Sequence, residues 1–542
     1  MENDFAIKNI PDNWELITLG ELLDKEGGAV QTGPFGSQLH ASDYVEKGIP
    51  SVMPKNITIE GINQDDIARI TYEDAHRLKK YLLAKGDIVY SRRGDVEKCA
   101  LVKNNESGWL CGTGCLRVRL GANSKLTPEY LHAYLSAPAI REWISRNAVG
   151  ATMPNLNTGI LKNVPLIVPT KKATQFIADA WLNINSKITL NKQTNHTLEK
   201  MAQALFKSWF VDFDPVFDNL LASVDFNLDN LEISLPDELK QKAQRRLAAL
   251  NSLENAAEIK ASLSALAHEL QAQLPTKEAT QAAVQVSEKA AETPVKANFN
   301  ANPDILAQHA NTHAHFPNEF VHNEQLGWIP KGWEKSQIQD LAKVVKGKSY
   351  KSAELSDSST ALVTLKSFKR GGGYRLDGLK GYTGKYKPEQ EVFAGDLIVA
   401  YTDVTQAADV IGKPAMVISD TKYEHLVVSL DVAVVRCFNE IHKNYLYGVM
   451  KTDAFQNHSR SYTSGTTVLH LKKEAVPEYC LALPDNEILS AFLGVSAPLY
   501  EKIDRLIDEN RALTKLRDTL LPKLISGELQ IPDVATDEKA VD

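Results

Sequence analysis

The sequence predicts an α/β (α+β) protein in which two duplicated mixed α/β globular domains are separated by two long, antiparallel coiled-coil helices. Short motifs recur in the same order at a nearly constant offset, which indicates a duplication. The early part of each repeat alternates apolar runs with turn residues, and the last part carries a seven-residue apolar pattern. At 542 residues, the chain is also too long for one compact core.

The repeat covers residues 11–215 and 322–531. Its matched motifs are Pro11-Asp12-Asn13-Trp14-Glu15 with Pro330-Lys331-Gly332-Trp333-Glu334, Gly86-Asp87-Ile88-Val89 with Gly395-Asp396-Leu397-Ile398, and Gly150-Ala151-Thr152 with Gly465-Thr466-Thr467. Single residues match at an offset of 315, among them Pro169 with Pro484 and Leu198 with Leu513. The shared order and offset predict two copies of one structural unit.

The early part of each repeat is expected to be rich in strands. Apolar or β-branched runs lie at residues 88–90, 116–120 and 164–168, and later at residues 361–365, 397–400 and 426–435. Gly, Asn, Asp and Pro separate these runs, which is typical of short strands joined by turns. We therefore expect one globular domain at residues 1–170 and another at residues 322–485.

The last part of each repeat, at residues 171–215 and 486–531, is expected to form a long helix. Residues 174–210 contain no Pro or Gly and place mostly apolar side chains at heptad positions a and d. Asn195 and Asn510 share one heptad slot, where a single polar residue fixes pairing register. The residues expected to pair the helices are Ile184, Ile188, Asn195, Leu198 and Leu205 with Leu499, Ile503, Leu506, Asn510, Leu513 and Leu520.

Antiparallel pairing of these helices would make a rod. At 1.5 Å per residue, about 36 helical residues extend roughly 54 Å. An antiparallel pair would relate the repeats by a pseudo-twofold axis and hold one globular domain at each end. The alternative is that each amphipathic helix packs only on its own domain.

Residues 216–321 interrupt the repeat with an acidic helical insert and linker. The stretch from Asp212 to Glu319 holds 16 Asp and Glu against 8 Lys and Arg. Residues 235–274 are expected to form one or two helices that begin at Pro236-Asp237-Glu238, and residues 275–299 to form a linker. The insert is either a partner-docking hairpin or an inert tether; residues 532–542 are expected to be a disordered tail.

Charge is distributed unevenly along the chain. The net charge of −7 argues against a nucleic-acid partner. Residues 77–162, however, hold 14 Lys and Arg against 6 Asp and Glu, and residues 331–387 hold 13 against 5. Two basic domains on a rod suit a DNA duplex, which presents the same groove face about every 34–36 Å. Because the repeats differ in sequence, the two DNA half-sites are expected to differ.

Candidate DNA contacts are basic and polar side chains on glycine-punctuated loops, which suit phosphates and base edges. In the first domain they are Lys55, Asn56, Ser91, Arg92, Arg93, Thr152, Asn155 and Asn157. In the second domain they are Lys366, Lys369, Arg370, Arg375, Tyr401, Thr402, Thr466 and Thr467. For each of them, an exposed loop with solubilising charge is the alternative.

No catalytic or metal site is expected. Residues 342–349 fit a relaxed phosphate-loop pattern but lack the flanking strand and helix. His309, His313, His315 and His322 have no Cys or carboxylate at fitting spacing and are expected to lie in a solvated linker. The five cysteines are expected to be buried, reduced thiols. The chain has no signal peptide and no run of 18 apolar residues, so we expect a cytoplasmic protein without membrane contact.

Several motifs resemble the specificity (S) subunit of type I restriction–modification systems, the HsdS family. Besides the repeated motifs, they are Thr32-Gly33-Pro34-Phe35-Gly36-Ser37, Leu326-Gly327-Trp328-Ile329-Pro330, and the strings at residues 205–216 and 521–529. The resemblance covers about 430 of the 542 residues. The insert is a departure, because this family commonly joins the first long helix to the second domain by a short connection.

The resemblance implies a non-catalytic chain with two target-recognition domains that bind a bipartite, asymmetric target in double-stranded DNA. The paired helices would fix the spacing of these domains and dock two methyltransferase (M) subunits. The M subunits would carry S-adenosylmethionine and methylate adenine, and restriction (R) subunits would cut DNA with ATP and Mg, so this chain needs no cofactor. The alternatives are a specificity module of a type II-like modification enzyme and a non-catalytic protein-binding adaptor.

Overall fold

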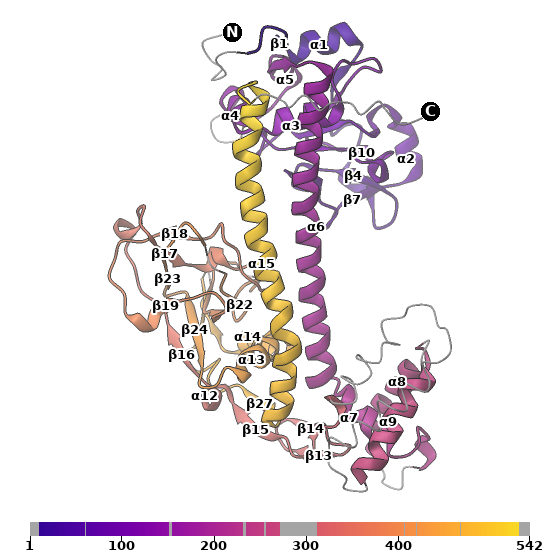
Figure 1. The fold of residues 1–542 in the computed structure, drawn as a ribbon, viewed down its shortest axis with the longest axis vertical. Helices are drawn as coiled ribbons and strands as arrows, with labels where there is room; N and C mark the ends of the chain where they lie inside the picture. Colours follow the sequence, from indigo (N-terminus) through magenta and orange to yellow (C-terminus); the bar gives the residue numbers. More distant parts are fainter. Residues whose placement is uncertain are drawn as a thin grey trace, which may run out of the picture. The chain divides into compact units, whose positions relative to one another are not determined.

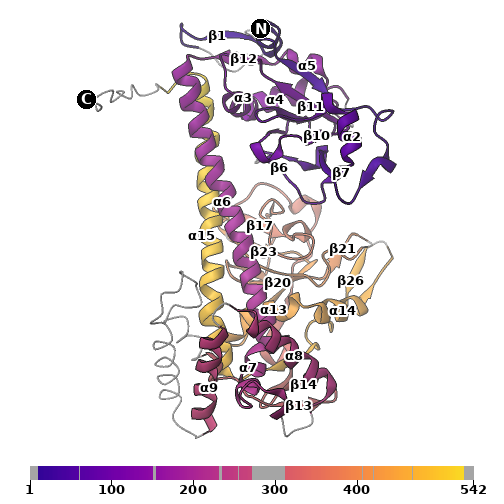
Figure 2. The same ribbon diagram turned by 90° about the vertical axis from the view of Figure 1, so that its right-hand side faces the viewer.

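The computed structural model describes residues 10–59, 61–150, 154–230, 235–253, 256–271, 312–405, 407–418, 420–466 and 468–529. The chain separates into two compact units (Figure 1; Figure 2). The first unit takes Met1–Asn195 together with Arg505–Asp542, and the second takes His196–Asp504. Each unit therefore combines a globular part with segments of both long helices.

The first unit is built around a four-stranded antiparallel sheet of order β2-β11-β8-β9. A second sheet has the order β10-β4-β7-β3, and β1 pairs with β12 where the globular part begins and ends. The strands are β1 (Glu15–Thr18), β2 (Ala29–Thr32), β3 (Tyr44–Val45), β4 (Ile49–Val52), β5 (Ile57–Thr58), β6 (Gly61–Ile62), β7 (Ala68–Ile70), β8 (Ile88–Ser91), β9 (Cys99–Leu101), β10 (Leu110–Cys111), β11 (Cys115–Arg119) and β12 (Pro165–Val168).

Local sequence signals start the helices of the first unit. These helices are α1 (Leu19–Glu26), α2 (Tyr72–Arg77), α3 (Pro128–Ser136), α4 (Pro138–Asn147) and α5 (Thr158–Lys162). Thr18 and Glu21 form a capping box at α1: the Thr18 hydroxyl accepts from the Glu21 N–H at 3.1 Å, and the Glu21 carboxylate accepts from the Thr18 N–H at 2.7 Å. The helices α3 and α4 begin with proline, whose missing N–H is harmless there.

The second unit repeats the sheet of the first. Its order β16-β24-β20-β22 is antiparallel throughout, and β15 pairs with β27 as β1 pairs with β12. The strands are β13 (Phe320–Asn323), β14 (Gly327–Pro330), β15 (Glu334–Gln337), β16 (Ala342–Lys346), β17 (Thr360–Val363), β18 (Lys380–Gly381), β19 (Glu391–Val392), β20 (Leu397–Ala400), β21 (Thr402–Asp403), β22 (Pro414–Met416), β23 (His425–Val428), β24 (Val432–Cys437), β25 (Thr463–Ser464), β26 (Leu469–Leu471) and β27 (Cys480–Leu483). Its short helices are α12 (Ile338–Leu341), α13 (Ile441–Lys451) and α14 (Asp453–Ser461). The predicted duplication of a mixed α/β domain is confirmed.

The repeated Gly-Asp motif closes the same turn in both units. The carboxylate of Asp87 accepts from the Ala84 N–H at 2.8 Å and from the Arg119 guanidinium at 2.6 Å. The carboxylate of Asp396 accepts from the Phe393 N–H at 2.8 Å and from the Arg436 guanidinium at 2.6 Å. The motif therefore ties the start of one central strand to its neighbour, β8 to β11 and β20 to β24.

The long helices are α6 (Lys171–Phe210) and α15 (Asn486–Ile525), with 40 residues each. In the first unit they run antiparallel, because Asn185 contacts Arg517 whereas Asn191 contacts Asn510. The Asn191 amide donates to Glu509 at 2.9 Å and to Asn510 at 3.0 Å. Asn510 thus faces Asn191, not its repeat equivalent Asn195, since antiparallel pairing sets an a position opposite a d position.

The predicted pairing residues form the covered stripe of each helix. Ile188, Ile503 and Leu506 are buried, and half-buried positions are Ile184, Asn195, Leu198, Leu205, Leu499, Asn510, Leu513 and Leu520. In the second unit, aromatic rings pack the end of α6 against the start of α15. The Phe210 and Phe492 rings are 4.9 Å apart and nearly perpendicular at 88°.

The helix α7 (Asp214–Ala222) leads into the insert, which contains α8 (Asp237–Asn251) and α9 (Ala256–Gln271). The helix α8 follows Pro236 directly, where the sequence predicts a helix start. Leu239 and Ala243 of α8 join the core of the second unit, so the helical part of the insert is not an inert tether. The predicted linker at residues 275–299, His309 and the tail at residues 532–542 lie outside the described residues. None of the described helices has the length and apolar character that a membrane span requires.

A buried ionic cluster holds the insert to the segment before β13. Asp218 is fully buried, and its carboxylate accepts from Arg246 at 2.7 Å and lies 3.0 Å from His313 Nε2. The prediction of a solvated His313 is wrong, because this residue is 3% exposed. Burial opposes ionisation of Asp218, but the hydrogen bonds from Arg246 and His313 outweigh it and lower its pKa to about 2.

Replacing Asp218 by Asn is expected to destabilise the second unit in a pH-dependent way. A pKa held below that of the unfolded chain adds stability above the ordinary Asp pKa, and this stability is lost as pH falls toward 2. We expect Asp218→Asn to cost about 2 kcal/mol of unfolding free energy at pH 7 and less at pH 3, measured by urea denaturation. Asp229→Asn, at an exposed carboxylate, is the control. A loss of equal size at both pH values contradicts the assignment.

Candidate nucleic-acid interface

In the first unit, several loops meet at the edge of the main sheet where β2 and β8 end. Gly33 donates its N–H to the Cys115 carbonyl at 2.9 Å, and Arg92 donates its N–H to the Gly114 carbonyl at 2.8 Å. A Cβ added at Gly114 would lie 3.2 Å from Cγ of Pro54. We call this the first loop cluster; its described residues are 33–37, 53–56, 92–94, 112–114, 149–150 and 154–157.

The first loop cluster presents cationic side chains. Lys55 and Arg93 are exposed, and Arg92 is half-buried. Arg92 Nε and Asn155 Oδ1 are buried without a hydrogen-bond partner among the described residues. Buried polar atoms are nearly always paired in folded proteins. These two unpaired atoms in one loop cluster favour a surface that an external ligand completes.

Two of the predicted contacts hold the loops rather than face outward. Asn56 is 1% exposed; its Oδ1 accepts from the Met53 N–H at 3.0 Å, and its amide donates to the Asn63 carbonyl at 3.1 Å. Ser91 is 2% exposed and donates to the Arg93 carbonyl at 2.7 Å. Their expected direct contacts with DNA are corrected, because their polar groups are buried and already bonded.

Asn157 and Phe35 differ from expectation in opposite ways. Asn157 is exposed, but its Oδ1 caps α5 by accepting from the Ile160 N–H at 2.9 Å. Phe35 was not among the expected contacts and is 55% exposed on the loop after β2. Its signal in the sequence is an aromatic residue within a Gly-Pro-Phe-Gly turn, a position that suits stacking on a base. Thr152 lies outside the described residues.

The second unit places Lys366 as the first places Lys55. Both lysines lie on one-turn 3₁₀ segments, Leu365–Ser367 and Pro54–Asn56. Ser367 Oγ accepts from the Thr364 N–H at 3.2 Å, as Asn56 Oδ1 accepts from the Met53 N–H. In both copies the lysine is exposed and the next residue is buried. The repeat therefore keeps one cation at one position on both scaffolds.

A glycine loop carries the other basic residues of the second unit. Gly371, Gly372 and Gly373 all have positive φ, at 85°, 103° and 95°, which side chains disfavour. The loop exposes Lys369 and Arg370, whose charges lie 4.0 Å from Glu199 and 3.8 Å from Asp409. Exposed pairs of this kind are weak, so phosphates can compete for these cations.

Arg375 is exposed but bound to Asp377, to which its Nε donates at 2.9 Å. This hydrogen bond lowers the pKa of the Asp377 carboxyl. Tyr401 and Thr402 are only 3% and 5% exposed, so their expected direct contacts are corrected: both lie beneath the surface beside β26. Thr466 is exposed at the turn between β25 and β26, and Thr467 lies outside the described residues.

No group of three or more His, Cys, Asp and Glu able to hold a metal occurs among the described residues. Burial raises the pKa of the Cys99 thiol to about 11 and that of Cys111 to about 12, so both stay protonated at neutral pH. What the two loop regions offer a ligand is positive charge and hydrogen-bond donors.

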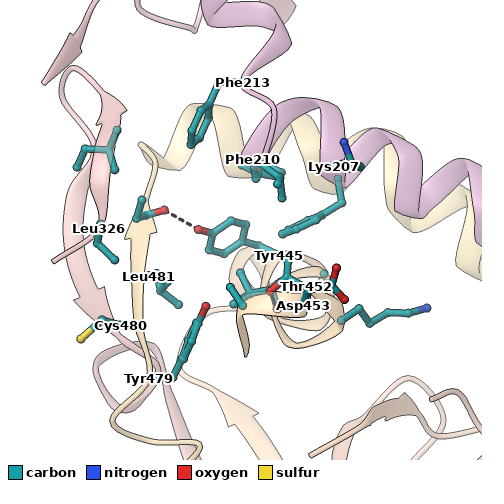
Figure 3. A pocket seen from close by; sticks show the side chains of 18 of the residues that line it. Lys207, Phe210, Phe213, Leu326, Tyr445, Thr452, Asp453, Tyr479, Cys480 and Leu481 are labelled. Carbon is teal, nitrogen blue, oxygen red and sulfur yellow. Dashed lines mark hydrogen bonds between the residues drawn. The ribbon is translucent and has the colours of Figure 1, made fainter. Parts of the chain in front are cut away.

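A cavity of about 1030 Å³ lies within the second unit, lined by the end of α6 and by residues of α13, α14, β14 and β27 (Figure 3). Phe210, Tyr445 and Tyr479 supply aromatic surface, and the Tyr445 hydroxyl donates to the Ala482 carbonyl at 2.5 Å. None of the predicted DNA contacts lines this cavity. It is therefore separate from the basic loops.

Comparison with known proteins finds similarity to one family. Residues 11–200 match the family model described as the type I restriction modification DNA specificity domain. The chain is 26% identical over 463 residues to the type I restriction enzyme HindI specificity subunit of Haemophilus influenzae, covering 83% of this chain and 88% of that protein. It is 22% identical over 548 residues to the MjaIX specificity subunit of Methanocaldococcus jannaschii, covering 97% and 96%.

Among solved structures, the type I restriction–modification S subunit from M. genitalium aligns with 97% of this chain and 99% of its own, at 13% identity and a TM-score of 0.46. The family match covers the first repeat, and the two relatives extend the similarity over most of the chain. The repeated motifs that carried the resemblance occur in the same order in the two copies, and each copy forms an equivalent sheet. Over most of its length, the chain is similar to the specificity subunits of type I restriction–modification systems.

Proposed function

We propose that this chain is the DNA sequence-recognition subunit of a type I restriction–modification complex. It binds a bipartite, asymmetric target in double-stranded DNA, with one half-site for each globular part. The observation that carries this proposal is the pair Lys55 and Lys366, exposed on equivalent turns of two equivalent scaffolds. Lysines at such positions suit backbone phosphates, which position a protein on DNA without reading its sequence.

Differences between the two copies account for the asymmetry of the target. The second residue after β8 is Arg93, which is exposed, and the second residue after β20 is Thr402, which is buried. The glycine loop of residues 371–373 has no counterpart of three glycines in the first domain. Shared residues therefore position the DNA, and divergent residues give each domain its own half-site.

The chemistry of the complex resides on its partners. Two M subunits, docked on the paired helices, carry S-adenosylmethionine and methylate adenine within the target. R subunits use ATP and Mg to cut DNA. This chain acts in the cytoplasm without a cofactor of its own and contributes recognition, not catalysis. Support for this division comes from the similarity to type I specificity subunits and from the cationic side chains of the loops.

Removing either equivalent lysine is expected to weaken DNA binding through lost phosphate neutralisation. Lys55→Ala and Lys366→Ala should each reduce the slope of log K against log salt by about 1, with the base preference of both half-sites unchanged. The measurement is a salt titration of DNA binding by the complex with M subunits. Lys25→Ala, at an exposed lysine before β2, is the control. An unchanged slope in both lysine variants rejects the phosphate assignment.

Breaking α6 is expected to prevent assembly with M subunits. Leu198→Pro removes a backbone donor in mid-helix and clashes with the preceding turn, a cost of about 3 kcal/mol or more. Co-purification with M subunits should then fail. Lys171→Pro places the same residue at the first helical position, where it is tolerated, and should preserve the complex. A full complex with Leu198→Pro contradicts docking on the paired helices.

A further inference from the structure

The segment after α4 in the first unit, and the segment after α14 in the second, each form a small antiparallel ribbon. In the second unit it consists of β25 and β26, with Ser464 opposite His470. In the first unit Val149 and Asn155 exchange backbone hydrogen bonds of 3.1 and 2.8 Å. We call these described residues, 149–150 with 154–155 and 463–466 with 468–471, the first and second ribbons.

Equivalent glycines, Gly150 and Gly465, lie in the two ribbons. Gly150 has φ of 110° and Gly465 has φ of 111°, in the region that favours glycine. A Cβ at Gly465 would lie 2.0 Å from the Val468 carbonyl oxygen. The glycine that opens the repeated Gly-x-Thr motif therefore has the same backbone conformation in both copies.

Each ribbon also pairs with the segment that follows a central strand of the main sheet, β8 in the first unit and β20 in the second. Arg93 lies opposite Asn155, and Thr402 lies opposite His470. The next residues repeat one contact: Leu156 donates its N–H to the Arg92 carbonyl at 2.9 Å, and Leu471 donates its N–H to the Tyr401 carbonyl at 2.8 Å. Asn155 and His470 therefore occupy the same position, on the central strand of three.

The side chains at this position are available to a ligand. His470 is exposed, and Asn155 is half-buried with its Oδ1 unpaired among the described residues. An unpaired buried acceptor is costly unless a donor arrives from outside. Exposed valines accompany both: Val149 is 64% exposed on the first ribbon, and Val468 is 37% exposed on the second.

These properties match the DNA major groove. The groove admits a two-stranded β-ribbon, an Asn amide pairs with adenine N6 and N7, and apolar side chains contact the thymine methyl. Resting on the proposed function, we infer that the ribbons are the major-groove readers of the two domains and that Asn155 and His470 are equivalent specificity-determining residues. Asn155 reads an adenine in the half-site of the first domain, and His470 reads a base in the half-site of the second.

The test is the adenine-methylation motif produced in cells by the chain with its M subunits, read by sequencing. Asn155→Ala should make one position of one half-site degenerate, with about 10-fold or greater loss of discrimination, and leave the other half-site intact. His470→Ala should do the same in the other half-site. Asn105→Ala and His425→Ala, at exposed residues outside the ribbons, are the matched controls and should preserve the wild-type motif.

Reciprocal exchange keeps the test decisive where an alanine variant is insoluble. Asn155→His and His470→Asn each place a residue that the same scaffold position already holds in the other copy. They should alter the preferred base at the same single positions as the alanine variants. If all four variants keep the wild-type motif, or if both sites change the same half-site, the inference is overturned while the proposed function stands. If the wild-type chain itself yields no motif, the proposed function fails and the inference with it.

Discussion

The contact on which both units depend is the packing of each globular part against the end of the long helix from the other repeat. In the first unit, Leu521, Leu524 and Ile525 of α15 belong to the core built around β8 and β11. In the second unit, Phe206 and Phe210 of α6 belong to the core built around β20 and β24. Neither repeat completes its hydrophobic core from its own residues, so folding of each unit requires both halves of the chain.

The Pro-x-x-Trp motif of each repeat packs at the end of the long helix from the other repeat. A Cβ at Gly527, just after α15, would lie 2.4 Å from Cγ of Pro11 in the first motif. Trp333 of the second motif packs on Phe210 and Phe213 at the end of α6, with ring centres 5.9 and 5.6 Å apart. This dependence explains why the motif persists in both copies while the loops diverge: it holds a helix end, and the loops face the ligand.

How far the sequence predicts the structure depends on the kind of signal. The duplication, the strands and the heptads follow from periodic patterns that burial imposes along the chain, and so Ile188 and Leu506 were predicted as buried. The interface is harder to predict, because the identity of a polar residue does not reveal whether its hydrogen-bonding groups are already paired within the protein. Asn56 and Lys55 are neighbours of similar polarity, yet one is buried in the turn and the other exposed. Tertiary contacts determine this difference in burial. They also determine the burial of His313, which contacts Asp218, a residue 95 positions away in sequence.

The central claim is that each repeat reads its own half of a split DNA target. Its most direct test is a comparison of DNA methylation in cells that express this chain with its M subunits and in cells that express the M subunits alone. The account predicts a two-part adenine-methylated motif, with different halves, that is present only when this chain is present. A motif that is identical without this chain, or no motif from a soluble complex, would contradict the account.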